Sequence, residues 1–166
     1  MFAIALLPYL MHRIVSKKYG FYDNPFQDLN KIHKKKYRPC VGIVLIQNGK
    51  IFSGQRLDYK SDAWQMPQGG IEYNENPLDA AIRELEEETG IKQKNIKLIS
   101  ETKKWINYDL PKDLVPKLWG GKYDGQKQKW FAMKFLGIDS DININTKHPE
   151  FSNWKWMTKE RLLEHI

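Results

Sequence analysis

The sequence predicts a single α+β domain, and three observations point to that class. Strand-like runs surround a turn signal in the first half, a glycine-containing loop leads directly into one amphipathic helix, and more strand-like runs follow that helix. The chain has 166 residues, of which 41% are hydrophobic, so it can bury one core of ordinary size. A second full domain is not expected.

The first predicted element is a β-hairpin. The apolar run VGIVLIQ precedes Asn48-Gly49, a dipeptide that favours a tight two-residue turn, and the run KIFSGQR follows it. A polar loop is expected over Leu57 to Asp62. In the next stretch, AWQMPQGGI, Pro67 and the Gly69-Gly70 pair are expected to break regular structure.

A helix is predicted between Asn76 and Gly90. Asn76 can cap the first amides, Pro77 suits the first turn, and Gly90 suits a left-handed stop. Apolar residues at helical spacing predict a face packed on a core; they are Leu78, Ala81, Ile82 and Leu85. The later segments predicted as strands are 96–100, 102–108, 129–137 and 154–157, and a second helix is predicted over 159–166.

The stretch RELEEETG, Arg83 to Gly90, gathers carboxylates on another face of this helix. Glu84, Glu87 and Glu88 are neighbours on the helix surface, where like charges cost about 0.2 to 0.5 kcal/mol per pair. The small Ala80, one turn earlier, is expected to leave room above them. Mg²⁺ prefers oxygen ligands and binds through a few carboxylates, so a cation site is one interpretation. A solvated acidic face is the alternative.

The composition favours an anionic partner and a reducing compartment. There are 27 basic and 20 acidic residues, a net charge of +7, which favours nucleic acid or nucleotide phosphates as partners. The single cysteine, Cys40, cannot form an internal disulfide and sits in an apolar run. We therefore expect a structural thiol and a cytoplasmic protein.

Residues 1–36 are predicted to be an extension and linker, apolar at first and then basic, for which disorder is one expectation. The first fifteen residues are too few to span a bilayer, contain Pro8, and lack the basic residues that precede a signal-peptide core. No stable membrane span is expected, and a signal or surface anchor is the alternative. The folded domain is expected over residues 37–166.

Nine positions in the glycine loop and the helix match the Nudix box, G-x5-E-x7-R-E-U-x-E-E-x-G-U with U aliphatic. They are Gly69, Glu75, Arg83, Glu84, Leu85, Glu87, Glu88, Gly90 and Ile91. The predicted loop and helix are the context that such a motif requires. The sequence therefore resembles the Nudix family. The resemblance implies an α/β/α sandwich around a mixed β-sheet, and hydrolysis of a nucleoside diphosphate linked to another group.

Five stretches resemble the bacterial RNA pyrophosphohydrolase branch of that family. They are YRPCVGIVL, AWQMPQGGI, YDLP, GQKQKWF and HPEFSNWKWM, so the likeness extends over residues 37–166. This branch is also similar to the dinucleoside polyphosphate hydrolases. Relatives continue beyond the position of Ile166 with a helix whose Phe-Lys pair contacts the 5′ base of RNA, and the given sequence stops before it.

The resemblance assigns the metal ligands. It implies that Glu84, Glu87 and Glu88, with the backbone carbonyl of Gly69, hold Mg²⁺, for which Mn²⁺ or Zn²⁺ could substitute. Clustered cations would neutralise bridging phosphates and acidify a bound water for attack at phosphorus. Glu150 matches a further glutamate across the metal cluster, as a fourth ligand or as the general base. Glu87 and Glu150 are both candidates for that base.

The remaining assignments concern positioning and substrate. Arg83 is expected to pair with Glu75 or with a ligand and so to fix its rotamer, and a surface ion pair is the alternative. Four basic residues are expected to meet the phosphates or the nucleotide. They are Arg38, Arg56, Lys127 and Lys129. Basic side chains at strand ends are often only solubilising, which is the alternative for each of them.

Three functions follow as hypotheses. The leading one is a metal-dependent RNA 5′-pyrophosphohydrolase that removes pyrophosphate from triphosphorylated RNA, leaves a 5′-monophosphate and promotes RNA decay. The second is hydrolysis of dinucleoside polyphosphates such as diadenosine tetraphosphate. The third is a catalytically silent nucleotide- or RNA-binding module, which the intact ligand set disfavours. We expect a monomer.

Overall fold

The computed structural model describes residues 35–57 and 63–165. The extension predicted over 1–36 and the loop predicted over 57–62 therefore lie almost wholly outside the described residues. Of the helices in the described part of the chain, none combines the length and the apolar character needed to cross a membrane.

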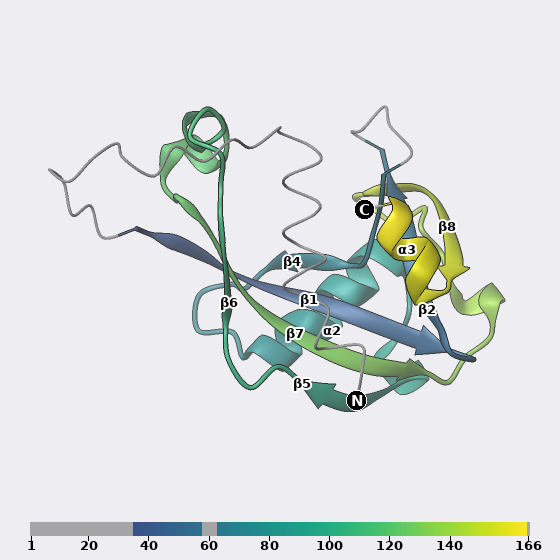
Figure 1. Cartoon of the computed structure of the whole chain (residues 1–166). Helices are drawn as coiled ribbons and strands as arrows, with labels where there is room; N and C mark the ends of the chain where they lie inside the picture. The colour runs from purple at the N-terminus through teal and green to yellow at the C-terminus, as the bar shows by residue number, and fades with distance from the viewer. Residues whose placement is uncertain (1–34, 58–62, 166) are drawn as a thin grey trace, which may run out of the picture.

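A mixed β-sheet forms the centre of the domain, with eight strands in the described ranges (Figure 1). These strands are β1 (Tyr37–Gln47), β2 (Lys50–Arg56), β3 (Trp64–Gln65), β4 (Gln68–Gly70), β5 (Ile96–Glu101), β6 (Ile106–Asp109), β7 (Gly125–Phe135) and β8 (Phe151–Met157). The main path runs β3-β2-β1-β7-β5, while β4 pairs with β1, β6 with β7 and β8 with β2. β1 and β7 run parallel and their other pairings are antiparallel, which makes the sheet mixed.

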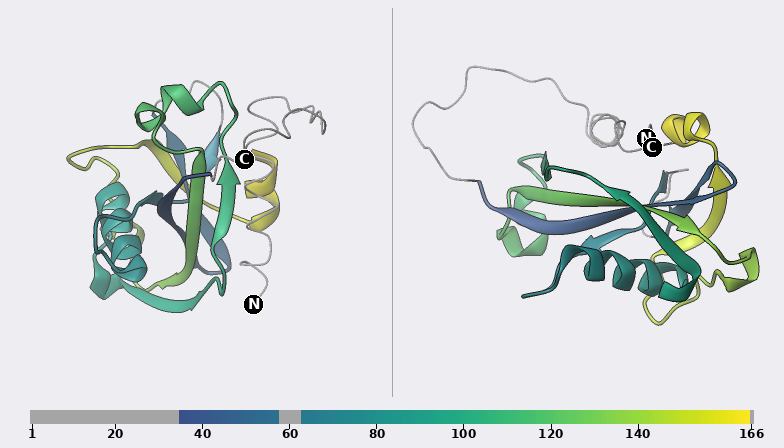
Figure 2. Two further views of the ribbon diagram at one scale, coloured as in Figure 1. Left: turned by 90° about the vertical axis from the view of Figure 1, so that its left-hand side faces the viewer. Right: turned by 90° about the horizontal axis from the view of Figure 1, so that it is seen from below.

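Helices α2 (Pro77–Thr89) and α3 (Lys159–His165) lie on opposite faces of this sheet (Figure 2, right). One buried cluster lies between α2 and the sheet and includes Val41, Ile43, Leu45, Phe52, Leu85, Phe131 and Met133. A second cluster lies on the α3 side and includes Val44, Trp64, Trp130, Met157 and Leu162. Successive side chains of a strand point to opposite faces, so β1 and β7 feed both clusters. The predicted α+β class and the α/β/α sandwich are confirmed.

The hairpin predicted from Asn48-Gly49 is also confirmed. Gln47 pairs with Lys50 across the turn. Asn48 and Gly49 have φ angles of 49° and 74°, in the left-handed region that a two-residue turn of this kind requires.

The prediction for AWQMPQGGI is wrong in part, because the short strands β3 and β4 form there. β4 places Gly69 opposite Val41 and Gly70 opposite Cys40, so this stretch pairs with the central strand β1. The pairing partner lies far away in the sequence, and the local pattern of glycine and proline gives no sign of it.

The bounds of β6 and β7 also differ from the prediction. The chain turns at Thr102, whose N–H donates to the Trp130 carbonyl (2.9 Å) and whose hydroxyl accepts from the Trp130 N–H (3.1 Å), and β6 begins only at Ile106. β7 begins at Gly125, because its polar first half is paired on both sides, with β1 and with β6. The other predicted strands and the final helix are confirmed with shifted ends, and Ile166 lies outside the described residues.

Gly42→Ala is expected to destabilise the fold, because a Cβ at this position would lie 2.5 Å from the buried Trp130 ring. Overpacking of this kind costs about 1 to 3 kcal/mol in free energy of unfolding, which urea denaturation measures. The double variant that also carries Trp130→Leu should recover part of the lost free energy of unfolding. A Gly42→Ala variant as stable as the wild type would contradict this packing of Gly42 against Trp130.

Candidate active site

Helix α2 is fixed at both ends, and this decides which of its side chains face the sheet. The Asn76 side chain accepts from the Leu78 N–H at 2.9 Å, and Pro77 lies in the first turn. Gly90 has φ of 70° and its N–H donates to the Glu86 carbonyl at 2.8 Å. The predicted caps are confirmed, and the acid-bearing turns of α2 are held against β4 and β1.

The backbone of β4 lies directly against Glu84. A Cβ on Gly69 would lie 1.9 Å from the carboxyl carbon of Glu84, so only glycine fits there. The structure thus brings together the Gly69 backbone and the Glu84 carboxylate. Ala80, in contrast, is fully buried in the core and leaves no room above the carboxylates, so that part of the sequence prediction is wrong.

Glu88 is the most buried acid of the cluster, with 2% of its surface exposed. One carboxylate oxygen accepts from the Gln68 N–H at 3.3 Å, and the other, Oε1, has no donor beside it. Burial raises the pKa of Glu88 well above its ordinary value, and the nearby charges of Glu150 and Glu84 raise it further. A buried carboxylate oxygen without a donor, beside two more acids, suits a cation.

Glu84 and Glu150 are the two acids whose charges act on Glu88. Burial raises the pKa of Glu84 above its ordinary value, and the charges of Glu87 and Glu150 add to this, while Arg83 opposes it. Glu150 is itself exposed, and its backbone carbonyl accepts from the Leu57 N–H at 2.9 Å. The loop before β8 therefore places Glu150 beside Glu84 and Glu88, although it lies far from them in the sequence.

Arg83 holds the cluster together from the outer side of α2. Its Nε and Nη2 donate to the two Glu75 carboxylate oxygens at 2.8 and 2.9 Å, and Nη2 also donates to the Gly70 carbonyl at 2.8 Å. Its Nη1 donates to Glu84 at 2.9 Å and to Glu87 at 3.0 Å. The bidentate hydrogen bonds from Arg83 lower the pKa of Glu75 below its ordinary value.

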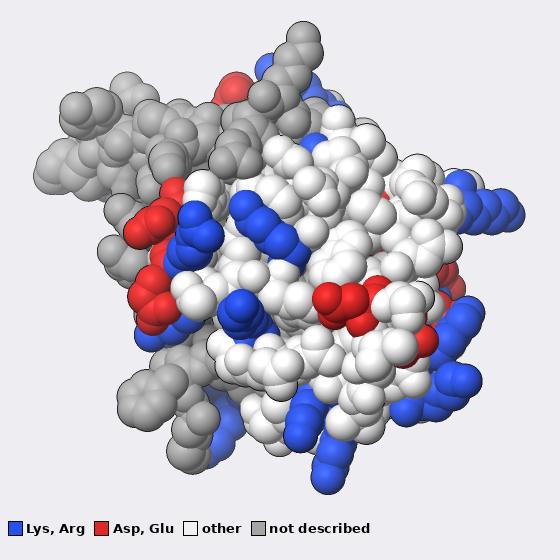
Figure 3. Space-filling view, turned by 90° about the vertical axis from the view of Figure 1, so that its right-hand side faces the viewer, with Lys and Arg blue, Asp and Glu red and all other residues white. Residues whose placement is uncertain are grey.

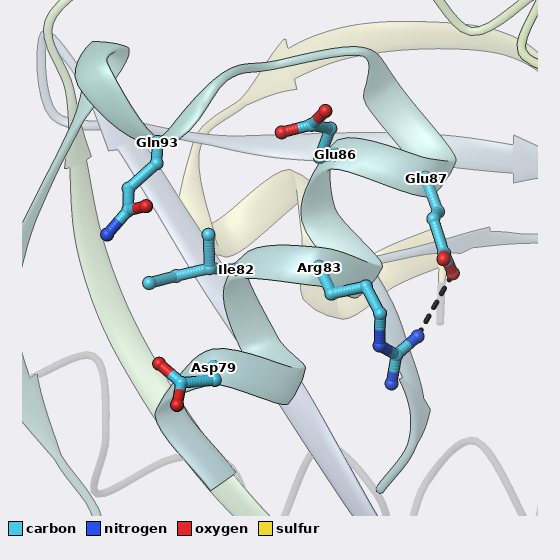
Figure 4. Close-up of a pocket in the computed structure, with 6 residues that line it drawn as sticks. All are labelled: Asp79, Ile82, Arg83, Glu86, Glu87 and Gln93. Atoms are coloured by element: carbon cyan, nitrogen blue, oxygen red, sulfur yellow. Dashed lines mark hydrogen bonds and ion pairs between the residues drawn. The ribbon is translucent and has the colours of Figure 1, made fainter. Parts of the chain in front are cut away.

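Glu87 occupies a more open position than the other acids. It lies with Arg83 at a shallow hollow on the outer side of α2, and a bond joins the two side chains (Figure 4). The hollow is lined by Asp79, Ile82, Arg83, Glu86, Glu87 and Gln93. The Glu87 side chain is 59% exposed. Glu87 is therefore accessible to solvent or to a ligand, whereas the buried Glu88 is accessible only to a group bound inside the site.

The residues present fit a divalent cation, although they are not yet gathered around one point. Among the residues described, no three acidic, histidine or cysteine side chains stand close enough together to hold a metal ion. Arg83 is bonded to both Glu84 and Glu87 in this arrangement. A cation that took over the Glu84 carboxylate would also neutralise one of the two charges that raise the pKa of Glu88, the other being that of Glu150.

The four basic residues expected at the substrate divide into two groups. Arg38 lies beside Gly70, where a Cβ would be 2.2 Å from its guanidinium, and Arg56 pairs with Phe151, next to Glu150. Both therefore lie close to the acid cluster.

Lys127 and Lys129 lie on the opposite face of β7 from Trp130, by the alternation of the strand. The Lys129 ammonium is 2.5 Å from the Thr102 carbonyl and 3.0 Å from Glu101, and Lys127 lies over the Trp105 ring at 5.3 Å. The structure thus places both lysines in contacts with the β5–β6 side of the sheet.

Sequence reasoning missed two residues of this region. Gln68 donates its backbone N–H to the buried Glu88, and its side-chain oxygen accepts from Gln128 at 3.2 Å. Trp119 lies beside Arg38, with the guanidinium 5.2 Å from the ring centroid. The pair Gly120-Gly121 after Trp119 was the available signal of an unusual backbone there.

The chain belongs to the Nudix family of hydrolases, because the family model described as NUDIX domain matches residues 36–166. Hydrolases of this family use divalent cations. The chain is 56% identical over 137 residues to the RNA pyrophosphohydrolase of Roseobacter denitrificans, covering 82% of this chain and 86% of that protein. It is 49% identical over 143 residues to the RNA pyrophosphohydrolase of Rickettsia bellii, covering 83% and 88%.

Solved structures confirm the fold. A C. elegans Ap4A hydrolase binary complex matches with a TM-score of 0.57 at 23% identity, covering 77% of this chain and 85% of that one. The E. coli dihydroneopterin triphosphate pyrophosphohydrolase matches with a TM-score of 0.59 at 22% identity, covering 78% and 96%. The family and fold that the sequence motif implied are confirmed.

Glu84→Gln and Glu88→Gln are each expected to lower phosphoanhydride hydrolysis. Loss of a charged ligand removes several kcal/mol of cation stabilisation, which corresponds to about 100-fold or more in rate. Glu86→Gln is the matched control, because Glu86 lies on the same helix and pairs with Lys92 at 2.6 Å, away from the cluster. Rates measured against Mg²⁺ concentration check this. Equal losses in all three variants would contradict a specific ligand set.

Glu75→Gln is expected to remove a pH-dependent contribution to stability. Because Arg83 lowers the pKa of Glu75 in the folded protein, the stabilisation is complete above the ordinary glutamate pKa and disappears as pH falls through the lowered value. The difference in free energy of unfolding between wild type and variant should therefore shrink as pH falls from neutral through the ordinary glutamate pKa of 4.5 and below it. Glu72→Gln is the control. A difference that stays constant over this range would be inconsistent with the pairing.

Proposed function

We propose that this protein is a divalent-cation-dependent RNA 5′-pyrophosphohydrolase, which removes pyrophosphate from triphosphorylated RNA and leaves a 5′-monophosphate. The observation that carries the proposal is the buried carboxylate of Glu88, without a donor at Oε1 and flanked by Glu84 and Glu150. The likeness to proteins named RNA pyrophosphohydrolase, at about half identity over most of both chains, supports the choice of substrate.

The proposed ligands of the cation are carboxylates of α2 together with the Gly69 carbonyl and Glu150. They are Glu84, Glu87, Glu88, Gly69 and Glu150. When bound, a divalent cation neutralises phosphate charge and makes a water molecule more acidic. We propose Mg²⁺ as the usual ion, with Mn²⁺ or Zn²⁺ as substitutes.

The protein residues contribute position and proton transfer. Gly69 holds the Glu84 carboxylate against β4, and Arg83 fixes Glu75 and Glu87. We propose Glu150 as the general base in preference to Glu87, because the Glu87 carboxylate is already bonded to Arg83. The water oxygen bonds to phosphorus, its proton passes to the base, and pyrophosphate leaves with the electrons of the broken P–O bond.

Substrate phosphates would be met by Arg38 and Arg56, which lie at the two ends of the cluster. Lys127 and Lys129 remain candidates only for more distant contacts, because their ammonium groups already lie against Trp105 and Glu101. On the face that carries β8, basic side chains stand in several separate places, with acidic groups between them (Figure 3). We infer that recognition of the polyphosphate is local to the site. We propose a cytoplasmic monomer that acts in RNA decay.

Hydrolysis of dinucleoside polyphosphates is the second candidate. Arg38 and its aromatic neighbour Trp119 would suit the phosphates and base of either substrate, so the described geometry accommodates both. The likeness to the Ap4A hydrolase is one of fold alone, at 23% identity.

Assay of triphosphorylated RNA beside diadenosine tetraphosphate tests the proposal. We expect pyrophosphate release and 5′-monophosphate ends from the RNA with Mg²⁺, a lower kcat/KM for the dinucleotide, and loss of both activities with a chelator. Hydrolysis of the dinucleotide alone would favour the second candidate. Binding of both ligands without any hydrolysis would favour a silent module.

A further inference from the structure

The chain between β6 and β7 makes an excursion, residues 110–124, that is tied to the start of β1. The Asp124 N–H donates to the Lys36 carbonyl, and the Lys36 N–H donates to the Asp124 carboxylate, each at 2.7 Å. The excursion contains the short 3-10 turns η3 (Val115–Lys117) and η4 (Trp119–Gly121). It lies next to the beginning of β1 at the upper left of Figure 1. It is therefore a built part of the fold next to Arg38.

The backbone of this excursion is unusual at Trp119. Its φ is 48°, and Gly120 and Gly121 follow with 63° and 73°, so three successive residues are left-handed. A bulky residue with positive φ is an outlier that persists only when its surroundings hold it, and such outliers gather at functional sites. The Tyr123 ring meets the Trp119 ring in a T-shaped contact with centroids 6.1 Å apart, and the Arg38 guanidinium lies over the Trp119 ring, 5.2 Å from its centroid. The indole is thus fixed in place while half-buried.

Trp119 is connected to the acid cluster by a short series of contacts. Arg38 touches Gly70, the Gly70 carbonyl accepts from Arg83, and Gly69 lies against Glu84. The thiol of Cys40, across from Gly70, has a pKa raised to about 11, chiefly by burial. Arg38 lowers and Glu84 raises that pKa, so both charges lie close to this one side chain.

Other tryptophans of the described chain are less suited to contact a ligand near the cluster. Trp64 and Trp130 are buried, and Trp154 and Trp156 pack on Phe52 in the core. Trp105 is 41% exposed, but it contacts Lys127 and directly precedes β6, which pairs with the edge of β7 opposite β1 and Arg38.

We propose that Trp119 is a specificity-determining residue that stacks on the nucleobase of the nucleotide whose phosphates reach Arg38 and the acid cluster. A fixed, partly exposed indole beside a guanidinium offers a base a flat surface and a phosphate its donors. This inference rests on the proposed function, because it assumes that a nucleoside polyphosphate enters the site.

The test compares triphosphorylated RNA that begins with adenosine and the same RNA with an abasic first nucleotide. Trp119→Ala should lower kcat/KM for the adenosine RNA by about 5- to 100-fold, mainly through KM, and change the abasic RNA by about twofold at most. Trp119→Phe should retain most of the preference for the base, and it serves as the readout if Trp119→Ala fails to fold. Trp105→Ala should keep the full preference.

Equal losses on both RNAs would overturn the proposal, because Trp119 would then act only by holding Arg38. Loss of the preference in Trp105→Ala instead would overturn it as well. If the wild type hydrolyses neither RNA, the proposed function fails, and calorimetric titration with ATP and with inorganic tripolyphosphate decides the stacking without turnover. Trp119→Ala must then weaken ATP binding more than tripolyphosphate binding, and equal weakening or no weakening would overturn the inference.

Discussion

The contact between the Gly69 backbone and the Glu84 carboxylate is the constraint on which the site depends. A side chain at Gly69 would occupy the place of that carboxylate, so β4 can lie against α2 only because the residue is glycine. Pairing with β1 fixes β4 on one side, and the caps at Asn76 and Gly90 fix α2 on the other. The acids are therefore positioned by elements that belong to the rigid centre of the fold.

The charges at this contact are held at a cost to stability. Burial and mutual repulsion raise the pKa of Glu84 and of Glu88, which means that the fold disfavours their charged forms. Arg83 relieves part of this by bonding to Glu84, Glu87 and Glu75. Buried acids whose charged forms the fold disfavours are typical of a functional site. A cation bound to these carboxylates would favour the charged forms instead.

The strand β4 separates two kinds of groups. Its Gly69 side faces the carboxylates of α2, and its Gly70 side faces Arg38, which lies against Trp119. Acids that suit a cation and groups that suit a nucleotide thus meet at one short strand. Both glycines are needed to leave space, Gly69 for a carboxylate and Gly70 for a guanidinium on the other side of the strand.

The sequence by itself determined the elements whose signals are local. The turn at Asn48-Gly49, the caps of α2 and the spacing of the acids depend on residues within a few positions of one another, where backbone preference and helical periodicity act. Tertiary structure alone decided what depends on distant partners. The pairing of β4 with β1, the burial of Ala80, the contacts of Lys129 with Glu101 and Thr102, and the place of Trp119 beside Arg38 each join segments that are remote in the chain. Such contacts arise from sheet register and packing, which no short stretch of sequence encodes.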